Sequence, residues 1–283
     1  MIGIMQGRLL PPEGGLFQCF PRQGWAAEFA RAADAELDAI EWIYDVWGQD
    51  ANPISSDDGV IRIKELSRQH SVSVVSLCAD YFMDRPLLRV HPAERDKRVD
   101  RLLWLIQRCQ RLGITRIVLP FVDNSRISSE QEMRDVISLL SDILPVAGAA
   151  SVEIHLETSL DPADFAKLLG QLPFANVKAN YDIGNSASLG YDFEEELGSY
   201  GEQIGSVHIK DRIRGGGTVP LGSGNADIPG VLEGLCKLGF SGDFILQVAR
   251  GEAGEELAWS RHNRKFLLSC LANSSGQGEK EGR

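Results

Sequence analysis

The sequence lacks the cysteine pattern and the long apolar run that would each point to a particular class of protein. Its five cysteines are odd in number, widely scattered and without a C-x-x-C pair, which argues against a disulfide framework or a thiolate zinc site. No apolar run approaches the roughly 18 residues that span a bilayer, so we expect no membrane partner. The segment Met1–Arg8 has no charged lead-in before a long apolar stretch. We therefore expect no signal peptide and a cytoplasmic location.

Basic residues are also in short supply. The formal net charge is −11, from 29 basic and 40 acidic residues. Because proteins bind nucleic acid chiefly by neutralising phosphates, this balance disfavours a nucleic-acid partner. No G-x-G-x-x-G follows the first apolar run, which makes a doubly wound open sheet the second choice of fold.

Short apolar runs alternate with longer segments of helical period. The amphipathic segments 94–112 and 130–144 carry apolar residues at spacings of three and four. Strand followed by helix, eight times in 283 residues, predicts a single-domain (β/α)8 TIM barrel over residues 1–273. The polar, glycine-rich residues 274–283 are expected to be a disordered tail. The predicted strands are Ile2–Met5, Ala39–Tyr44, Val72–Ala79, Arg116–Val122, Val152–Thr158, Val177–Ile183, Ser206–Ile209 and Phe244–Ala249.

Polar side chains recur at every second position in four of these runs. Such an alternation directs the aliphatic residues under the helices and the polar residues into the barrel. The last polar residue of each run is expected at the carboxyl end of its strand, where barrel enzymes hold their catalytic groups. These four residues are Glu157, Asp182, His208 and Gln247; His155 lies one layer deeper and is expected to pack or to support a ligand.

A single carboxylate in a strand is more often half of a structural ion pair than a catalytic group. Four polar groups at one level favour a different interpretation, because two crowded carboxylates repel unless a cation lies between them. We therefore predict one divalent metal ion held by Glu157, Asp182, His208 and Gln247. This oxygen-rich set with one nitrogen favours Mn²⁺, Mg²⁺ or Co²⁺, with Zn²⁺ as a further candidate.

The same residues carry a resemblance to a known family. Glu157 in His-Leu-Glu-Thr, Asp182 in Tyr-Asp-Ile-Gly-Asn and His208 in Val-His-Ile-Lys-Asp are 25 and 26 residues apart. Pro-Leu-Gly-Ser-Gly at 220–224 and then Gln247 follow them. In this order the motifs resemble the sugar phosphate isomerase/epimerase branch of the xylose-isomerase-like TIM barrels, over essentially the whole chain.

The resemblance implies a metal-dependent sugar isomerase or epimerase with Glu157 as both ligand and base. In that family the base removes the proton beside a ketose carbonyl, and the metal stabilises the resulting cis-enediolate. Asn185 stands where some relatives have a substrate-contacting histidine, and Arg214 matches a substrate-contacting arginine. Family members are often dimers or tetramers, so the resemblance also implies a homo-oligomer.

Gln247 departs from the family, whose epimerases have a second glutamate at this position. An amide oxygen can ligate a metal, but it cannot accept a proton at neutral pH. If Gln247 takes part in catalysis, the pattern favours keto–aldose isomerisation or another one-base enolisation over two-base epimerisation. A different residue or a water molecule remains an alternative source of the second proton.

Basic residues gather after the predicted strands, at the mouth of the barrel. They are Arg8, Lys210, Arg212, Arg214 and Arg250, of which Arg8, Lys210, Arg214 and Arg250 are the candidates for binding substrate. We therefore expect an anionic substrate, a sugar phosphate or a sugar acid. Solvated arginines that balance nearby acids are the equal alternative. Asp80, after the third predicted strand, is a weaker candidate for contacting substrate hydroxyls or phosphate.

Three other functions occur or are conceivable in a barrel of this kind, and the sequence disfavours the first of them. An apurinic-site endonuclease needs three zincs, and five histidines, three of them in predicted helices or loops, do not supply the ligands. A lyase or dehydratase acting on a keto-sugar or inosose would use the same enolate. An inactive sugar-binding barrel would explain Gln247, and the absence of Mn²⁺ or Co²⁺ binding would favour it.

Overall fold

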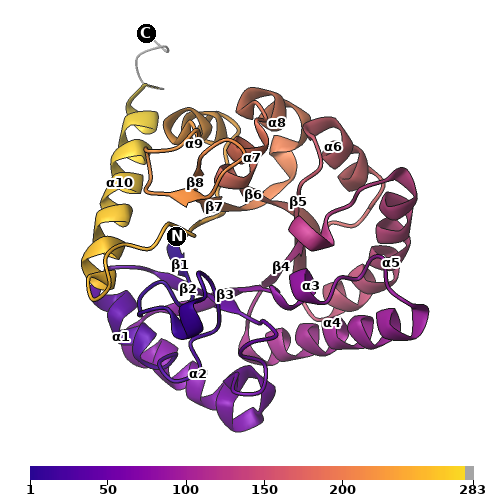
Figure 1. Ribbon diagram of the computed structural model, residues 1–283, viewed down its shortest axis with the longest axis horizontal. Helices are drawn as coiled ribbons and strands as arrows, with labels where there is room; N and C mark the ends of the chain where they lie inside the picture. Colours follow the sequence, from indigo (N-terminus) through magenta and orange to yellow (C-terminus); the bar gives the residue numbers. More distant parts are fainter. Residues whose placement is uncertain (278–283) are drawn as a thin grey trace.

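Eight parallel strands close into a barrel in the computed structural model, which describes residues 1–277 (Figure 1). Around the barrel the order is β1-β10-β7-β6-β5-β4-β3-β2. The predicted (β/α)8 TIM barrel is confirmed, and each predicted strand overlaps an observed one. The strands are β1 Ile2–Met5, β2 Ala39–Ile43, β3 Ser73–Cys78, β4 Arg116–Phe121, β5 Glu153–Thr158, β6 Val177–Asp182, β7 Ile204–Ile209 and β10 Asp243–Leu246.

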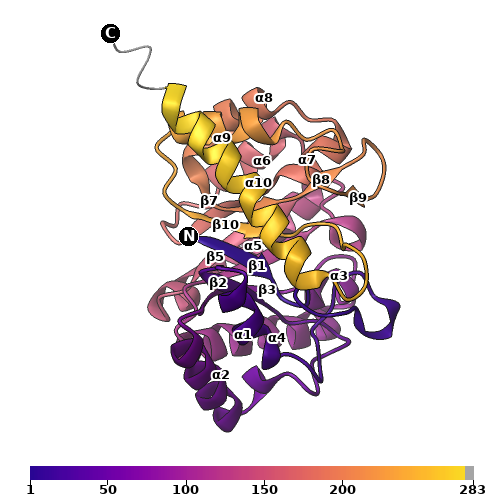
Figure 2. The ribbon, with the colours of Figure 1, turned by 90° about the vertical axis from the view of Figure 1, so that its left-hand side faces the viewer.

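Helices form a ring outside the strands, and α10 runs along one side of the barrel (Figure 2). Several begin at polar caps, because a side-chain oxygen accepts a backbone N–H that the first turn leaves unpaired. Ser129 caps α5 and Asp161 caps α6 in this way. The helices are α1 Ala27–Asp34, α2 Asp57–His70, α3 Tyr81–Asp84, α4 Pro92–Leu112, α5 Glu130–Ala149, α6 Pro162–Gly170, α7 Ile183–Leu189, α8 Phe193–Tyr200, α9 Ile228–Lys237 and α10 Glu256–Gln277.

The alternation within the strands separates the outer core from the interior of the barrel. Ile154 and Leu156 on β5 are fully buried members of the hydrophobic core. His155 and Glu157, between and after them, instead make polar contacts with β7. The period-two prediction therefore assigned the two faces of β5 correctly.

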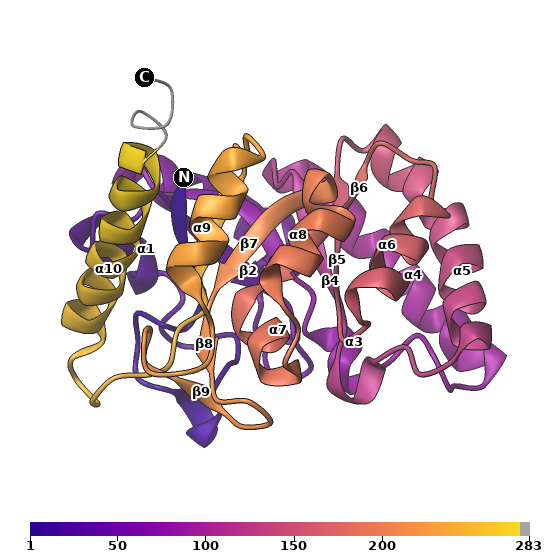
Figure 3. The ribbon, with the colours of Figure 1, turned by 90° about the horizontal axis from the view of Figure 1, so that it is seen from above.

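The carboxyl ends of the strands lie at the end of the barrel away from the N-terminus (Figure 3). A short antiparallel hairpin, β8 Asp211–Arg212 with β9 Thr218–Val219, extends from β7 at this end, beside α7. The Asp211 carboxylate fixes the segment after the hairpin by accepting backbone N–H groups from Gly222, Gly224 and Ala226. These bonds hold the segment after β9 in place beside the mouth of the barrel.

The predicted boundary after residue 273 falls inside α10, which continues to Gln277. Residues 278–283 of the predicted tail lie outside the described residues. No helix among the described residues combines the length and the apolar character needed to cross a membrane.

Replacing a core aliphatic residue of β5 should destabilise the barrel. We expect Leu156→Ala to lower the free energy of unfolding by about 2–5 kcal/mol, because truncation leaves a cavity in a fully buried site. Denaturant unfolding followed by circular dichroism measures this change. Leu268→Ala, at a residue 39% exposed on α10, is the matched control and should change the free energy by less than about 0.5 kcal/mol. Equal losses of stability in the two variants would contradict the assignment of Leu156 to the face of β5 that lies in the hydrophobic core.

Candidate metal centre and active site

Three potential metal ligands converge from three adjacent strands. Glu157 lies near the end of β5, Asp182 ends β6 and His208 lies on β7. One ligand atom from each side chain lies within 4.8 Å of the other two, and all three residues are buried. His208 Nδ1 is 3.3 Å from Glu157 Oε2 and 3.8 Å from Asp182 Oδ2. The strands thus bring together three of the four predicted ligands.

The opposite nitrogen of His208 is held from across the barrel. His208 Nε2 lies 2.7 Å from Glu41 Oε1, and both side chains are fully buried. Because β1 and β10 separate β2 from β7 in the barrel order, this hydrogen bond crosses the interior. Glu41 was not among the predicted site residues. Its signal was a single charged residue inside the apolar run Ala39–Ile43.

Two asparagines orient Glu157. Asn180 Nδ2 donates to Glu157 Oε2 at 3.1 Å and lies 3.1 Å from His208 Nδ1. Asn185 Nδ2 donates to Glu157 Oε1 at 2.7 Å, while the Asn185 backbone N–H donates to Asp182 Oδ1 at 2.8 Å. Asn185, predicted to contact substrate, therefore lies in direct contact with two of the predicted ligands.

Gln247 lies beside this cluster but is engaged by Lys210. The Lys210 ammonium donates to Asp182 Oδ2 at 3.2 Å and to Gln247 Oε1 at 3.0 Å. The amide nitrogen of Gln247 donates to Gln18 Oε1 at 3.2 Å. The oxygen predicted to ligate a metal thus accepts a hydrogen bond from an ammonium in this structure.

The buried charges shift one another's titration. Burial by itself would raise the pKa of Asp182, but the Lys210 ammonium and the His208 ring lower that pKa to about 2. Burial disfavours a charged His208, yet the carboxylates of Glu41, Asp182 and Glu157 raise its pKa well above the ordinary value. These carboxylates favour the protonated ring, whose Nδ1 faces the position that a metal cation would take.

Arg8 and Arg250 hold the loop that follows β1. Arg8 donates from Nε to the Val248 carbonyl at 3.0 Å and from Nη1 to the Phe17 carbonyl at 2.9 Å. Arg250 donates to the carbonyls of Phe17 and Leu10, each at 2.9 Å. Both guanidinium groups, predicted to bind substrate, thus bind backbone oxygens at the mouth.

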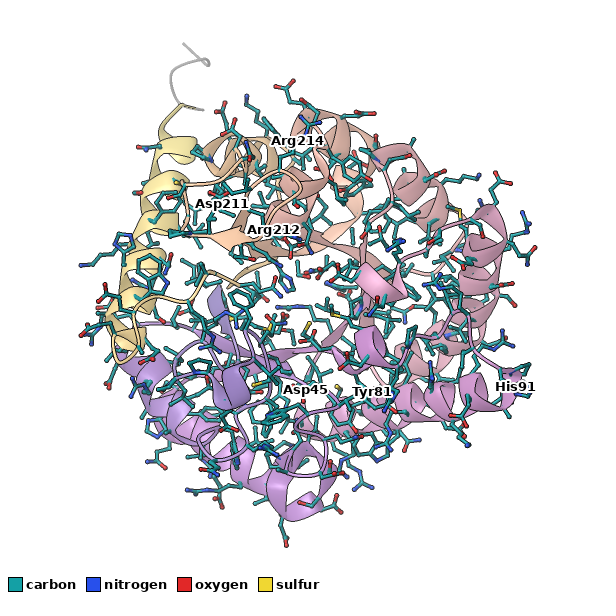
Figure 4. The ribbon with its side chains drawn as sticks, in the orientation of Figure 1. Asp45, Tyr81, His91, Asp211, Arg212 and Arg214 are labelled. Carbon is teal, nitrogen blue, oxygen red and sulfur yellow. The ribbon has the colours of Figure 1, made fainter. Side chains whose placement is uncertain are left out.

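Arg212 lies closer to the cluster than Arg214 does. Figure 4 shows Arg212 nearer the centre of the barrel and Arg214 farther out. Arg212 Nη1 donates to Asn185 Oδ1 at 2.8 Å, and Asn185 in turn donates to Glu157. Arg214 is exposed, and its guanidinium lies against Gly190. The basic residue in contact with the cluster on this side is therefore Arg212, two positions before the one predicted.

A polar chain supports the cluster from below. His155 Nδ1 is 2.7 Å from Ser206 Oγ, and Ser206 Oγ donates to Asn180 Oδ1 at 2.6 Å. His155 Nε2 is 2.9 Å from Glu153 Oε2. His155 thus stays one layer deeper than Glu157 and fixes the amide of Asn180, so that its NH₂ group faces Glu157.

The donor set fits a divalent ion. Two carboxylates and one imidazole are common ligands, and a histidine ligand usually donates its other N–H to a carboxylate or carbonyl. Here Glu41 occupies Nε2, which directs Nδ1 toward Glu157 and Asp182. In the described part of the chain no second cluster of histidine, cysteine and acidic residues has ligand spacing, in contrast to a three-zinc endonuclease.

A family model for the xylose isomerase-like TIM barrel matches residues 29–270 of the chain. No curated protein matches it significantly.

Solved structures of the same fold include several that act on sugars or hold metals. An L-ribulose 3-epimerase aligns with a TM-score of 0.79 and 17% identity, over 100% of this chain and 98% of its own. D-psicose 3-epimerase from Clostridium cellulolyticum H10, solved with D-tagatose, aligns with a TM-score of 0.74 and 13% identity, over 95% of this chain and 99% of its own. The IOLI protein, solved with a bound zinc atom, aligns with a TM-score of 0.77 and 16% identity, over 96% of this chain and 98% of its own.

Metal binding should release a proton from His208. Because Nδ1 must lose its proton to ligate, we expect Mn²⁺ binding at pH 7 to release about one proton per ion. In Glu41→Gln the His208 ring loses a charged partner and the pKa of His208 falls. Binding of Mn²⁺ should then release fewer protons per ion. Calorimetry in two buffers of different ionisation enthalpy measures the release. Glu36→Gln, at an exposed residue, is the control. Unchanged release in Glu41→Gln would contradict the role assigned to Glu41.

Proposed function

Because this chain belongs to the xylose isomerase-like TIM barrel family, we propose that it is a metal-dependent isomerase or epimerase of polyhydroxy ketones. One observation carries the proposal: ligand atoms of Glu157, Asp182 and His208 meet within 4.8 Å at the carboxyl ends of three strands. These residues would hold one divalent ion. When bound, such an ion supplies positive charge to the carbonyl oxygen and the neighbouring hydroxyl of a ketose.

Glu157 is the proposed base. Asn180 and Asn185 each donate one hydrogen bond to its carboxylate and hold its two oxygens in place. Arg212 fixes the Asn185 amide by donating to its oxygen, so that its NH₂ group faces Glu157. Glu157 would take the proton from the carbon beside the carbonyl and leave an enediolate, and returning that proton to the neighbouring carbon would interconvert ketose and aldose.

The proposed substrate is unphosphorylated. Arg8 and Arg250 donate to backbone carbonyls, and Arg214 lies outward against Gly190. Lys210 is already paired with Asp182. Arg8, Arg250 and Lys210 therefore bind protein oxygens, and Arg214 lies away from the cluster. Amides and carboxylates suited to sugar hydroxyls surround the cluster instead.

Replacing the proposed base Glu157 should strongly slow both the exchange of the substrate's carbon-bound proton and the conversion of the sugar. We expect the wild-type protein with Mn²⁺ to exchange the carbon-bound proton of a free ketose with D₂O, and Glu157→Gln to lower this rate by about 10²–10⁴-fold. Nuclear magnetic resonance of the recovered sugars measures the exchange. Glu195→Gln, at an exposed residue on α8, is the control. Exchange that continues in Glu157→Gln would refute the assignment, and a product lighter by one water would identify a dehydratase.

Inorganic phosphate should not compete with the substrate. Because Arg8 and Arg250 bind backbone carbonyls and Arg214 lies farther from the cluster, we expect millimolar phosphate to leave KM for a free ketose unchanged. Steady-state kinetics with and without phosphate, at constant ionic strength, tests this. Competitive inhibition that disappears in Arg214→Ala would instead restore the sugar-phosphate prediction.

A further inference from the structure

Epimerisation through an enediolate needs a proton donor on the face opposite the base. Glu157 can return a proton only from its own side of the substrate, and the Gln247 amide has no proton to exchange at neutral pH. Among the carboxyl groups at this end of the barrel, Asp182 is paired with the Lys210 ammonium. Asp45 and Asp211 accept backbone N–H groups from nearby loops. Asp80, two residues beyond the end of β3, instead contacts side chains only.

Asp80 is linked to Gln247 through a single side chain. Gln18 Nε2 donates to Asp80 Oδ2 at 2.7 Å, and Gln18 Oε1 accepts from Gln247 Nε2 at 3.2 Å. Arg8 Nη2 also donates to that oxygen at 2.9 Å. With two donors facing its oxygen, the Gln18 amide can only present its NH₂ group to Asp80. The Asp80 carboxyl is therefore held in place, and only the Gln18 amide lies between it and Gln247.

The surroundings of Asp80 allow it to carry a proton. Its other oxygen, Oδ1, is 3.1 Å from Cys78 Sγ. Arg8 attracts the Asp80 charge but forms no ion pair with it in residues 1–277, because Gln18 lies between the two side chains. Enclosure by the surrounding protein raises the pKa of Asp80 to about 6, with further contributions from the charges of Asp45 and Glu157. A carboxyl group that titrates near neutral pH is suited to donate and regain a proton.

We propose that Asp80 is the second proton-transfer group of this site and supplies the proton that Gln247 cannot. This inference rests on the proposed function. Glu157 takes the proton from the carbon beside the carbonyl, and the C–H electron pair enters the enediolate. The Asp80 carboxyl then gives its proton to the same carbon from the other face, which restores the carbonyl and inverts that carbon. Between turnovers Glu157 loses its proton to water and Asp80 regains one.

Lys210 is the alternative donor, and its geometry is less suitable. Its ammonium donates to Asp182 and to Gln247, so two of its three N–H groups are already engaged. It can hydrogen-bond a substrate oxygen through its third N–H, but releasing a proton would leave Asp182 without its cation. Asp80 has no such partner to lose.

The test separates exchange from inversion. L-ribulose, D-tagatose and D-fructose are incubated in D₂O with the Mn²⁺-loaded wild-type protein, Asp80→Asn and Asp84→Asn. Asp84 is an exposed carboxylate on α3 and serves as the matched control. Nuclear magnetic resonance measures deuterium at the carbon beside the carbonyl, and chromatography measures the epimer.

Wild type and Asp84→Asn should form an epimer that carries deuterium at the inverted carbon. Asp80→Asn should still exchange deuterium into the unconverted ketose, because Glu157 is intact, while epimer formation falls by about 10²–10⁴-fold. Epimer formed by Asp80→Asn at the wild-type rate, or loss of exchange together with epimer, would overturn the assignment of Asp80 alone. Absence of exchange with every ketose in the wild type would overturn the proposed function and this inference with it.

Discussion

A hydrogen bond across the barrel interior, from His208 Nε2 to Glu41 Oε1, is the contact on which the geometry of the site depends. It fixes the imidazole and directs Nδ1 toward Glu157 and Asp182. Three carboxylates around one buried ring require a positive charge, because burying unpaired charges is costly. The carboxylates favour a protonated ring, which supplies one positive charge, and a divalent cation at Nδ1 would supply more.

A second constraint is the direction of the hydrogen bonds around the mouth. Lys210 can only donate and the Asp80 carboxylate accepts, so the two amides between them must each accept on one side and donate on the other. Gln247 and Gln18 do this. A glutamate at 247 could accept from Lys210, but its carboxylate could not donate to Gln18. Gln247 cannot act as a base, but its amide, together with Arg8, orients the Gln18 NH₂ group toward Asp80.

Period-two and helical patterning predicted the barrel, its eight strands and the inward face of β5, because burial on a parallel sheet dictates these patterns locally. The same pattern brought Glu157, Asp182 and His208 to one level. It could not predict Glu41, whose partner is 167 residues away in the sequence. Nor could it distinguish Arg212 from Arg214, because the turn of the β8–β9 hairpin decides which of them faces the barrel. The engagement of Arg8 and Arg250 with backbone carbonyls likewise depends on the path of the loop after β1.

His208, Glu157 and Asp182 are proposed to hold one divalent cation together. A crystal structure of the protein soaked in Mn²⁺, with anomalous diffraction to locate the ion, tests this proposal. We expect a single strong anomalous peak at coordination distance from His208 Nδ1 and from one oxygen each of Glu157 and Asp182, with Nε2 still bonded to Glu41. No peak there, or coordination through Nε2, would contradict it.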